Sequence, residues 1–163
     1  MTNYWSTCSS SSALPAWFSN RLKRLVRTPK RHLTDPALLA PIVTLTETEV
    51  FRDGDPLGRV LDSFVTAQVR AEVGVARQRC SLHHLRTKEG RQEIDLVVET
   101  SRGLIAMEVK ASAAPDARSS SHLRWLREQL GERFVLGIVW HTGPFAYQLD
   151  ERIIAAPISA LWT

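Results

Sequence analysis

Apolar side chains repeat at helical spacing in three segments, which predicts helices over residues 15–27, 57–73 and 119–130. Gly74 follows the second segment and favours a helix end there. A further short helix is expected from Pro36, because an acidic residue before a proline is a favourable helix start. The stripes consist of Phe18, Leu22 and Leu25, then Leu61, Phe64, Val65 and Val69, and last Leu123, Leu126 and Leu130.

Strand-forming runs lie in the second half of the chain. Residues 82–87, 93–100, 104–111 and 133–140 predict strands, and residues 151–162 predict a short strand followed by a turn of helix. The order of these elements predicts an α/β fold with a mixed sheet flanked by helices. The strand after the crossover helix should run parallel to an earlier strand.

Length and composition are those of a single domain. The chain has 163 residues, of which 44% are hydrophobic, and we expect residues 15–163 to fold while the Ser-rich residues 1–14 are disordered. Cys8 and Cys80 are far apart, which fits a reducing compartment. No apolar run is long enough to span a membrane, and no signal peptide is recognisable, so we expect a cytoplasmic protein without membrane contact.

Positive charge is concentrated near the N-terminus. The formal net charge is +4, yet the segment between residues 21 and 31 carries six basic residues and no acidic one. This pattern favours an anionic partner such as DNA or RNA, or an acidic protein surface, and a solvated helix face is the alternative. The predicted nucleic-acid-binding residues are Arg21, Lys23, Arg24, Arg27, Lys30 and Arg31.

Three ionisable residues interrupt two apolar strand segments in "RQEIDLVVETSRGLIAMEVKAS", residues 91–112. A hairpin turning at Ser101 and Arg102 would place Asp95 opposite Glu108, with Cβ atoms about 5 Å apart. Two carboxylates at that distance repel unless a cation lies between them, which favours a divalent metal such as Mg²⁺ or Mn²⁺. Lys110 would then hold an anionic oxygen or orient a water.

Side-chain alternation sets the faces of these strands. Glu93, Asp95 and Val97 should share one face of the first strand, with Ile94 on the other. The same hairpin register pairs Glu93 with Lys110. The alternative interpretation is therefore an exposed polar strand face with an ordinary cross-strand salt bridge between these two residues.

The motifs resemble a known class of domain. "EID" on one strand and "MEVKAS" on the next resemble the PD-(D/E)XK nuclease motif. Together with "LPAWFSNRLKRLVRTPKRHLTDPALL", "LGRVLDSFV" and "PISALW", in that order, they are similar to the uncharacterised C-terminal domain of prokaryotic AAA-type ATPases. The resemblance runs from about Leu14 to the C-terminus. It implies a restriction-endonuclease-like core.

The resemblance also implies roles for individual residues. Asp95 and Glu108 would bind Mg²⁺, Lys110 would assist the hydrolytic water, and Asp62 on the preceding helix would complete the metal site. Asp62 is shorter than the usual Glu at this position. No G-x-x-x-x-G-K-[ST] loop occurs, so the chain lacks an ATP site of that kind and the ATPase module itself.

Two functions follow from these expectations. The first is a nuclease-like domain with possible Mg²⁺-dependent hydrolysis of phosphodiester bonds in DNA or RNA, and the complete set of Asp95, Glu108 and Lys110 favours it. The alternative is a non-catalytic nucleic-acid-binding or docking module that belongs with an AAA ATPase module or subunit. Asp62 in place of Glu and the missing ATPase favour this second function.

Overall fold

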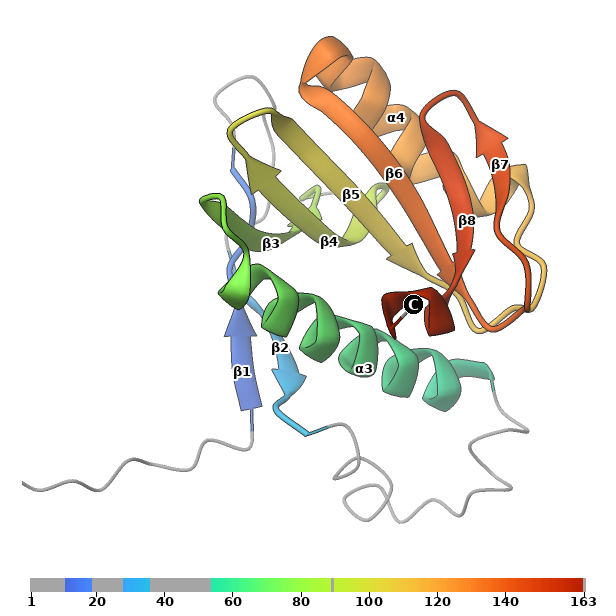
Figure 1. Ribbon diagram of the computed structural model, residues 1–163, viewed down its shortest axis with the longest axis horizontal. Coiled ribbons are helices and arrows are strands. Elements are labelled where there is room, and N and C mark those ends of the chain that lie inside the picture. The colour runs from blue at the N-terminus through green and yellow to red at the C-terminus, as the bar shows by residue number, and fades with distance from the viewer. Residues whose placement is uncertain (1–10, 19–27, 36–53, 89, 163) are drawn as a thin grey trace, which may run out of the picture.

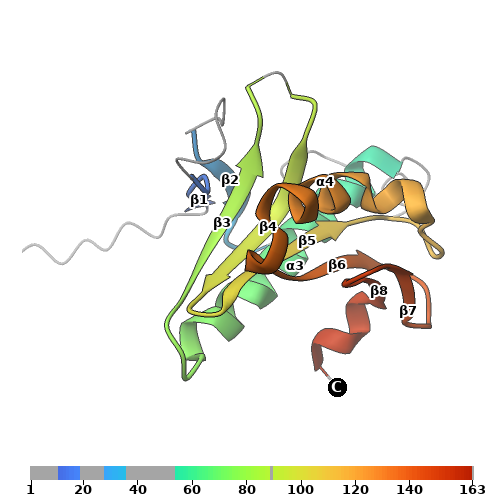
Figure 2. The same ribbon diagram turned by 90° about the horizontal axis from the view of Figure 1, so that it is seen from above.

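A computed structural model describes residues 11–18, 28–35, 54–88 and 90–162. These residues form a mixed six-stranded sheet with a helix on each face, together with a two-stranded hairpin (Figures 1 and 2). The helices are α3 (Gly54–Val75) and α4 (Ser121–Leu130), with short 3-10 helices at Ala117–Ser120, Gly131–Arg133 and Ile158–Trp162. The strands are β1 (Ser11–Leu14), β2 (Lys30–Leu33), β3 (Cys80–Arg86), β4 (Glu93–Thr100), β5 (Gly103–Val109), β6 (Phe134–His141), β7 (Tyr147–Asp150) and β8 (Ile153–Pro157). The predicted α/β class with a mixed sheet is confirmed.

The large sheet has the strand order β3-β4-β5-β6-β8-β7. β3, β4 and β5 are antiparallel neighbours, whereas β5, β6 and β8 run parallel and β7 pairs antiparallel with β8. α4 connects β5 to β6, so the parallel pairing predicted after the crossover helix is confirmed. Because β4 and β5 are antiparallel, the start of β4 lies beside the end of β5, in the interior of the sheet.

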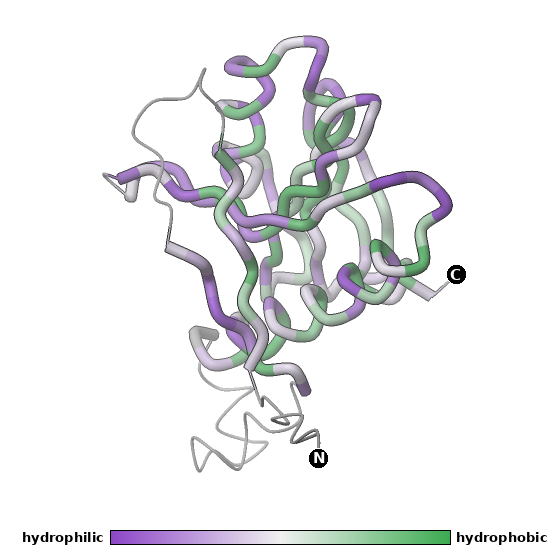
Figure 3. Tube along the Cα trace, turned by 90° about the vertical axis from the view of Figure 1, so that its left-hand side faces the viewer, coloured by the Kyte–Doolittle hydropathy of each residue, from purple (hydrophilic) through white to green (hydrophobic). Residues whose placement is uncertain are grey.

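Two apolar cores lie on opposite faces of the sheet. In the α4-side core, Leu123, Leu126 and Leu130 pack with strand residues such as Val97. In the α3-side core, Val65 and Val69 are among the residues packed with other strand side chains. The predicted apolar stripes of both helices thus face the sheet. Hydrophobic residues concentrate along the strands, and the outer loops are largely hydrophilic (Figure 3).

The sequence did not predict the hairpin of β1 and β2. Ser11–Leu14 belong to the segment expected to be disordered, yet they form β1 and pair antiparallel with β2. Leu14 is fully buried in the α3-side core, which explains the order of this strand. Residues 1–10 lie outside the described residues.

The helix expected over residues 15–27 is absent at residues 15–18. Ala16 instead forms a β-bridge with His84 on β3, and Trp17 is buried in the α4-side core. The apolar side chains here belong to an extended segment that packs against β3 at the edge of the sheet. Spacing along the sequence alone could not distinguish such a segment from a helix. Residues 19–27 and the short helix expected from Pro36 lie outside the described residues.

The remaining expected elements agree closely with the structure. α3 contains the helix predicted over residues 57–73, and β4 has the predicted bounds. The sequence did not predict β7, because a strand of four residues is too short to show a clear alternation of apolar and polar positions. Within the described residues, neither helix combines the length and apolar character needed to cross a bilayer.

Candidate active site

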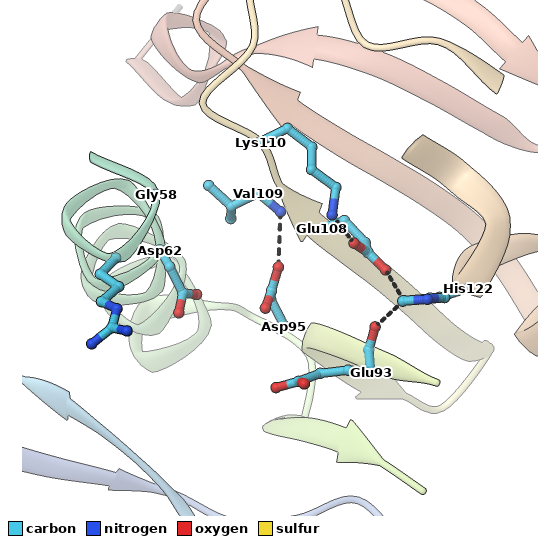
Figure 4. Close-up of a pocket in the computed structure, with 9 residues that line it drawn as sticks. Gly58, Asp62, Glu93, Asp95, Glu108, Val109, Lys110 and His122 are labelled. Atoms are coloured by element: carbon cyan, nitrogen blue, oxygen red, sulfur yellow. Dashed lines mark hydrogen bonds and ion pairs between the residues drawn. The ribbon is translucent and has the colours of Figure 1, made fainter. Parts of the chain in front are cut away.

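Polar side chains from four parts of the fold line one open pocket of about 320 Å³. Asp62 comes from α3, Asp95 from the start of β4, and Glu108 from the end of β5. The pocket, called the acidic pocket below, is lined by Gly58, Arg59, Asp62, Glu93, Asp95, Glu108, Val109, Lys110 and His122 (Figure 4). All four residues that the sequence assigned to catalysis or metal binding are brought together here.

The β4–β5 hairpin has the predicted register. Thr100 pairs with Gly103, and the ladder continues to Leu96 opposite Met107. Ser101 and Arg102 form the turn, as expected. The ladder ends at Leu96 and Met107, the residues next to Asp95 and Glu108, so the hairpin brings both carboxylates to the same pocket.

The expected alternation of faces along β4 is wrong near Asp95. The sequence placed Val97 on the face of Asp95 and Ile94 on the other, but Ile94 and Val97 pack in the same α4-side core. The pairing of β4 with β3 shifts between His83 and Leu85. Such a bulge re-aims nearby side chains, and Asp95 consequently meets groups on the α3 side of the sheet.

Asp95 and Asp62 share one cation, the ammonium group of Lys30 on β2. Lys30 Nζ lies 2.9 Å from Asp62 Oδ2 and 3.1 Å from Asp95 Oδ1. The backbone N–H of Val109 donates to Asp95 Oδ2 at 3.0 Å. Asp62 Oδ1 is buried and has no hydrogen-bond partner. The sequence did not indicate this pairing, because Lys30 and Asp95 are far apart along the chain.

The environment of Asp62 disfavours its charge. Burial, followed by the nearby charge of Asp95, raises the pKa of Asp62 from 3.8 to about 6, although Lys30 acts in the opposite direction. For Lys30 itself, burial lowers the pKa, but the two carboxylates outweigh it and the pKa is raised overall. The ion pair with Lys30 therefore offsets only part of the cost of charging Asp62.

Glu108 is held from two sides and is only 3% exposed. Its Oε2 lies 2.7 Å from Lys110 Nζ, and its Oε1 lies 3.1 Å from His122 Nδ1 on α4. His122 Nδ1 is also hydrogen-bonded to the backbone carbonyl of Glu93, at 2.6 Å. The Glu108 carboxylate raises the pKa of His122. Sequence analysis missed His122, since only the packing of α4 on the sheet brings it to the carboxylates.

The basic N-terminal segment is described only in part. Lys30 lies at the acidic pocket, where its ammonium group contacts carboxylates, and Arg31 is exposed on β2. Arg21, Lys23, Arg24 and Arg27 lie outside the described residues.

Comparison with known proteins gives a family and two relatives. The family described as "Domain of unknown function (DUF4143)" matches residues 57–161, a range that holds every residue lining the acidic pocket but not Lys30. The chain is similar to the uncharacterised proteins Rv2008c of Mycobacterium tuberculosis and Mb2031c of Mycobacterium bovis, with 27% identity over 150 residues to each. The match covers 92% of this chain and 32% of each relative, so the chain spans about a third of the length of these curated relatives.

Proposed function

We propose that this chain, which belongs to the DUF4143 family, is a nuclease-like domain that hydrolyses phosphodiester bonds of DNA or RNA with a divalent cation. The observation that carries the proposal is the acidic pocket, where Asp62, Asp95 and Glu108 meet beside Lys110. Carboxylate oxygens are the ligands that hard cations take, and a neighbouring lysine can hold an anionic oxygen.

Mg²⁺ or Mn²⁺ fits the chemistry of this donor set. Asp62 Oδ1 is buried without a hydrogen-bond partner, and Lys30 already places a positive charge between Asp62 and Asp95. No three His, Cys, Asp or Glu side chains of the described residues are yet close enough to hold one ion. Asp62, Asp95 and Glu108 line the same pocket and are the residues that we assign to the ion, which they would have to approach more closely to hold it. Such an ion lowers the pKa of water and offsets the charge of a phosphate.

The other residues of the pocket orient these groups. The N–H of Val109 fixes one oxygen of Asp95, and His122 lies against one oxygen of Glu108. Lys110 contacts the second oxygen of Glu108 and carries the charge suited to a phosphate oxygen or an attacking water. We assign Lys110 the catalytic role together with Asp95 and Glu108, and His122 the role of a positioning residue.

The finer fold assignment is part of the proposal. The "EID" motif and the start of "MEVKAS" lie on adjacent strands, and the helix that carries Asp62 lines the same pocket, which supports a PD-(D/E)XK, restriction-endonuclease-like fold. The relatives are about three times the length matched by this chain, which leaves room in them for further domains. We accordingly propose two partners for this chain, which are nucleic acid and an AAA-type ATPase module or subunit.

A non-catalytic nucleic-acid-binding or docking module is the second candidate function. The observation that favours it is Lys30, which pairs with two of the three carboxylates from within the chain. A pocket balanced in this way can be stable without any metal ion. In that case the acidic pocket would only stabilise the fold, and the surface of the domain would bind an ATPase or nucleic acid.

Metal titration combined with a cleavage assay tests the two functions. The wild-type chain should bind Mn²⁺ or Mg²⁺ in calorimetry and cut at least one of supercoiled, linear and single-stranded substrates. Asp95→Asn should lose both properties, because the amide keeps the shape but not the charge. Glu151→Gln is the matched control, since the Glu151 side chain is 77% exposed and outside the pocket. Absence of both ion binding and cleavage in the wild type would leave the docking module as the function.

A further inference from the structure

We propose that Lys30 is the resident cation of the acidic pocket and decides when a divalent ion is accepted, because the ion can enter only as the lysine leaves. This inference rests on the proposed function of the pocket. It assigns a specificity-determining role to a residue outside the part of the chain that matches the family.

The geometry makes the two cations mutually exclusive. Lys30 Nζ lies 2.9 Å from Asp62 Oδ2 and 3.1 Å from Asp95 Oδ1, so the ammonium group bridges two carboxylates from different elements. Divalent ions take carboxylate oxygens at about 2.0–2.6 Å. An ion on these two oxygens would lie within contact distance of Nζ, and the two positive charges would repel in a partly buried site.

Lys30 can withdraw without disrupting the fold. It pairs with Leu14 at the end of the β1–β2 ladder, and its charge is carried on a flexible four-carbon stem. Its side chain is 25% exposed, so a path to solvent exists. The backbone of the hairpin stays anchored meanwhile, because Leu14 and Trp17 are buried in the two cores.

Each carboxylate keeps an oxygen that Lys30 does not use. Asp62 Oδ1 has no hydrogen-bond partner, and Asp95 Oδ2 is fixed by the N–H of Val109. Glu108 is held by Lys110 and His122 and does not contact Lys30. Departure of the Lys30 side chain therefore frees Asp62 and Asp95 for an ion, toward which Glu108 would then have to move. The strength of the Lys30 ion pairs should therefore set the concentration of divalent ion at which the pocket becomes occupied.

Calorimetry with Mn²⁺ alone tests the exchange. Lys30→Met keeps the length of the side chain and removes its charge, so the variant should bind Mn²⁺ roughly tenfold more tightly than the wild type, or better. Lys30→Arg retains a cation and should stay close to the wild type. Arg31→Met is the matched control, because it removes the same charge from the neighbouring, exposed position of β2. Its Mn²⁺ affinity should not change.

A second measurement uses the unaltered chain. NMR of the Lys30 ammonium group should show a restrained signal without the ion, and Mg²⁺ should move it to the position of solvent-exposed lysines. Equal Mn²⁺ affinity in the wild type and Lys30→Met, or a Lys30 signal unchanged while Mg²⁺ binds, would overturn the role of Lys30 and leave the proposed function intact. Absence of ion binding in all variants would overturn both.

Discussion

Lys110 and Glu108 form a close ion pair in the acidic pocket, with 2.7 Å between Nζ and Oε2. An ammonium group cannot ligate a metal ion, so Lys110 acts only on water or phosphate in the proposed reaction. We predict that Lys110→Ala abolishes cleavage in the presence of Mg²⁺ and leaves ion binding within about tenfold of the wild type. Cleavage assays and calorimetry on the same preparation measure both effects.

Lys88→Ala is the control for this substitution, because Lys88 is exposed and does not line the pocket. Cleavage should persist in it. A Lys110→Ala variant that cuts as fast as the wild type would contradict the catalytic role of Lys110.

Asp62 gives stability a definite dependence on pH. Its pKa rises from 3.8 to about 6 on folding, mainly through burial, so the native state binds the extra proton between these values. The free energy of unfolding should therefore fall as the pH rises from about 4 to 6, by at most about 3 kcal/mol from this group. Urea denaturation at a series of pH values measures this fall. Asp62→Asn should remove it, and parallel pH profiles of the two proteins would contradict the assignment.

Among the elements, the β4–β5 hairpin decides whether Asp95 and Glu108 meet. Gly103 begins β5 with φ +140°, and a Cβ there would lie 2.3 Å from the carbonyl oxygen of Arg133. We predict that Gly103→Ala lowers the free energy of unfolding by about 2–4 kcal/mol, because backbone strain and the clash add. Urea denaturation measures the loss.

Gly74→Ala serves as the control for the hairpin substitution. Gly74 lies in α3 with open space around its Cα, so alanine should leave stability unchanged or raise it by up to about 1 kcal/mol. Equal stability of the two variants would show that the turn tolerates a side chain and that the register has another cause.

The hairpin also shows how far sequence reasoning reaches at the level of elements. α3 and the β4–β5 register were predictable because each depends on residues that are neighbours along the chain. The apolar stripe predicts the helix, and the turn at residues 101 and 102 predicts the register. The bulge in β4 depends on pairing with β3, and Lys30 reaches Asp62 through the β1–β2 hairpin. Such long-range contacts leave no periodic signal, so the carboxylates were predicted but not their partners.

The charge distribution matters at the scale of the whole molecule. The net charge is +4, and six basic residues lie between positions 21 and 31. We predict that replacing Lys23, Arg24 and Arg27 with alanine weakens DNA binding and lowers the log-log salt slope by about one for each phosphate that is no longer neutralised. Fluorescence anisotropy at several salt concentrations measures both. Unchanged affinity would exclude this segment as the nucleic-acid contact.

The α3-side core has a consequence for how the chain reaches its fold. It joins Leu14 to Ile158, residues near opposite ends of the described chain. Contacts between such distant positions form late, and a nascent chain on the ribosome cannot complete them until Ile158 has emerged. Until that moment the apolar stripe of α3 lacks part of its covering. Chaperones and proteases should therefore compete for this surface from the emergence of α3 until Ile158 has left the ribosome.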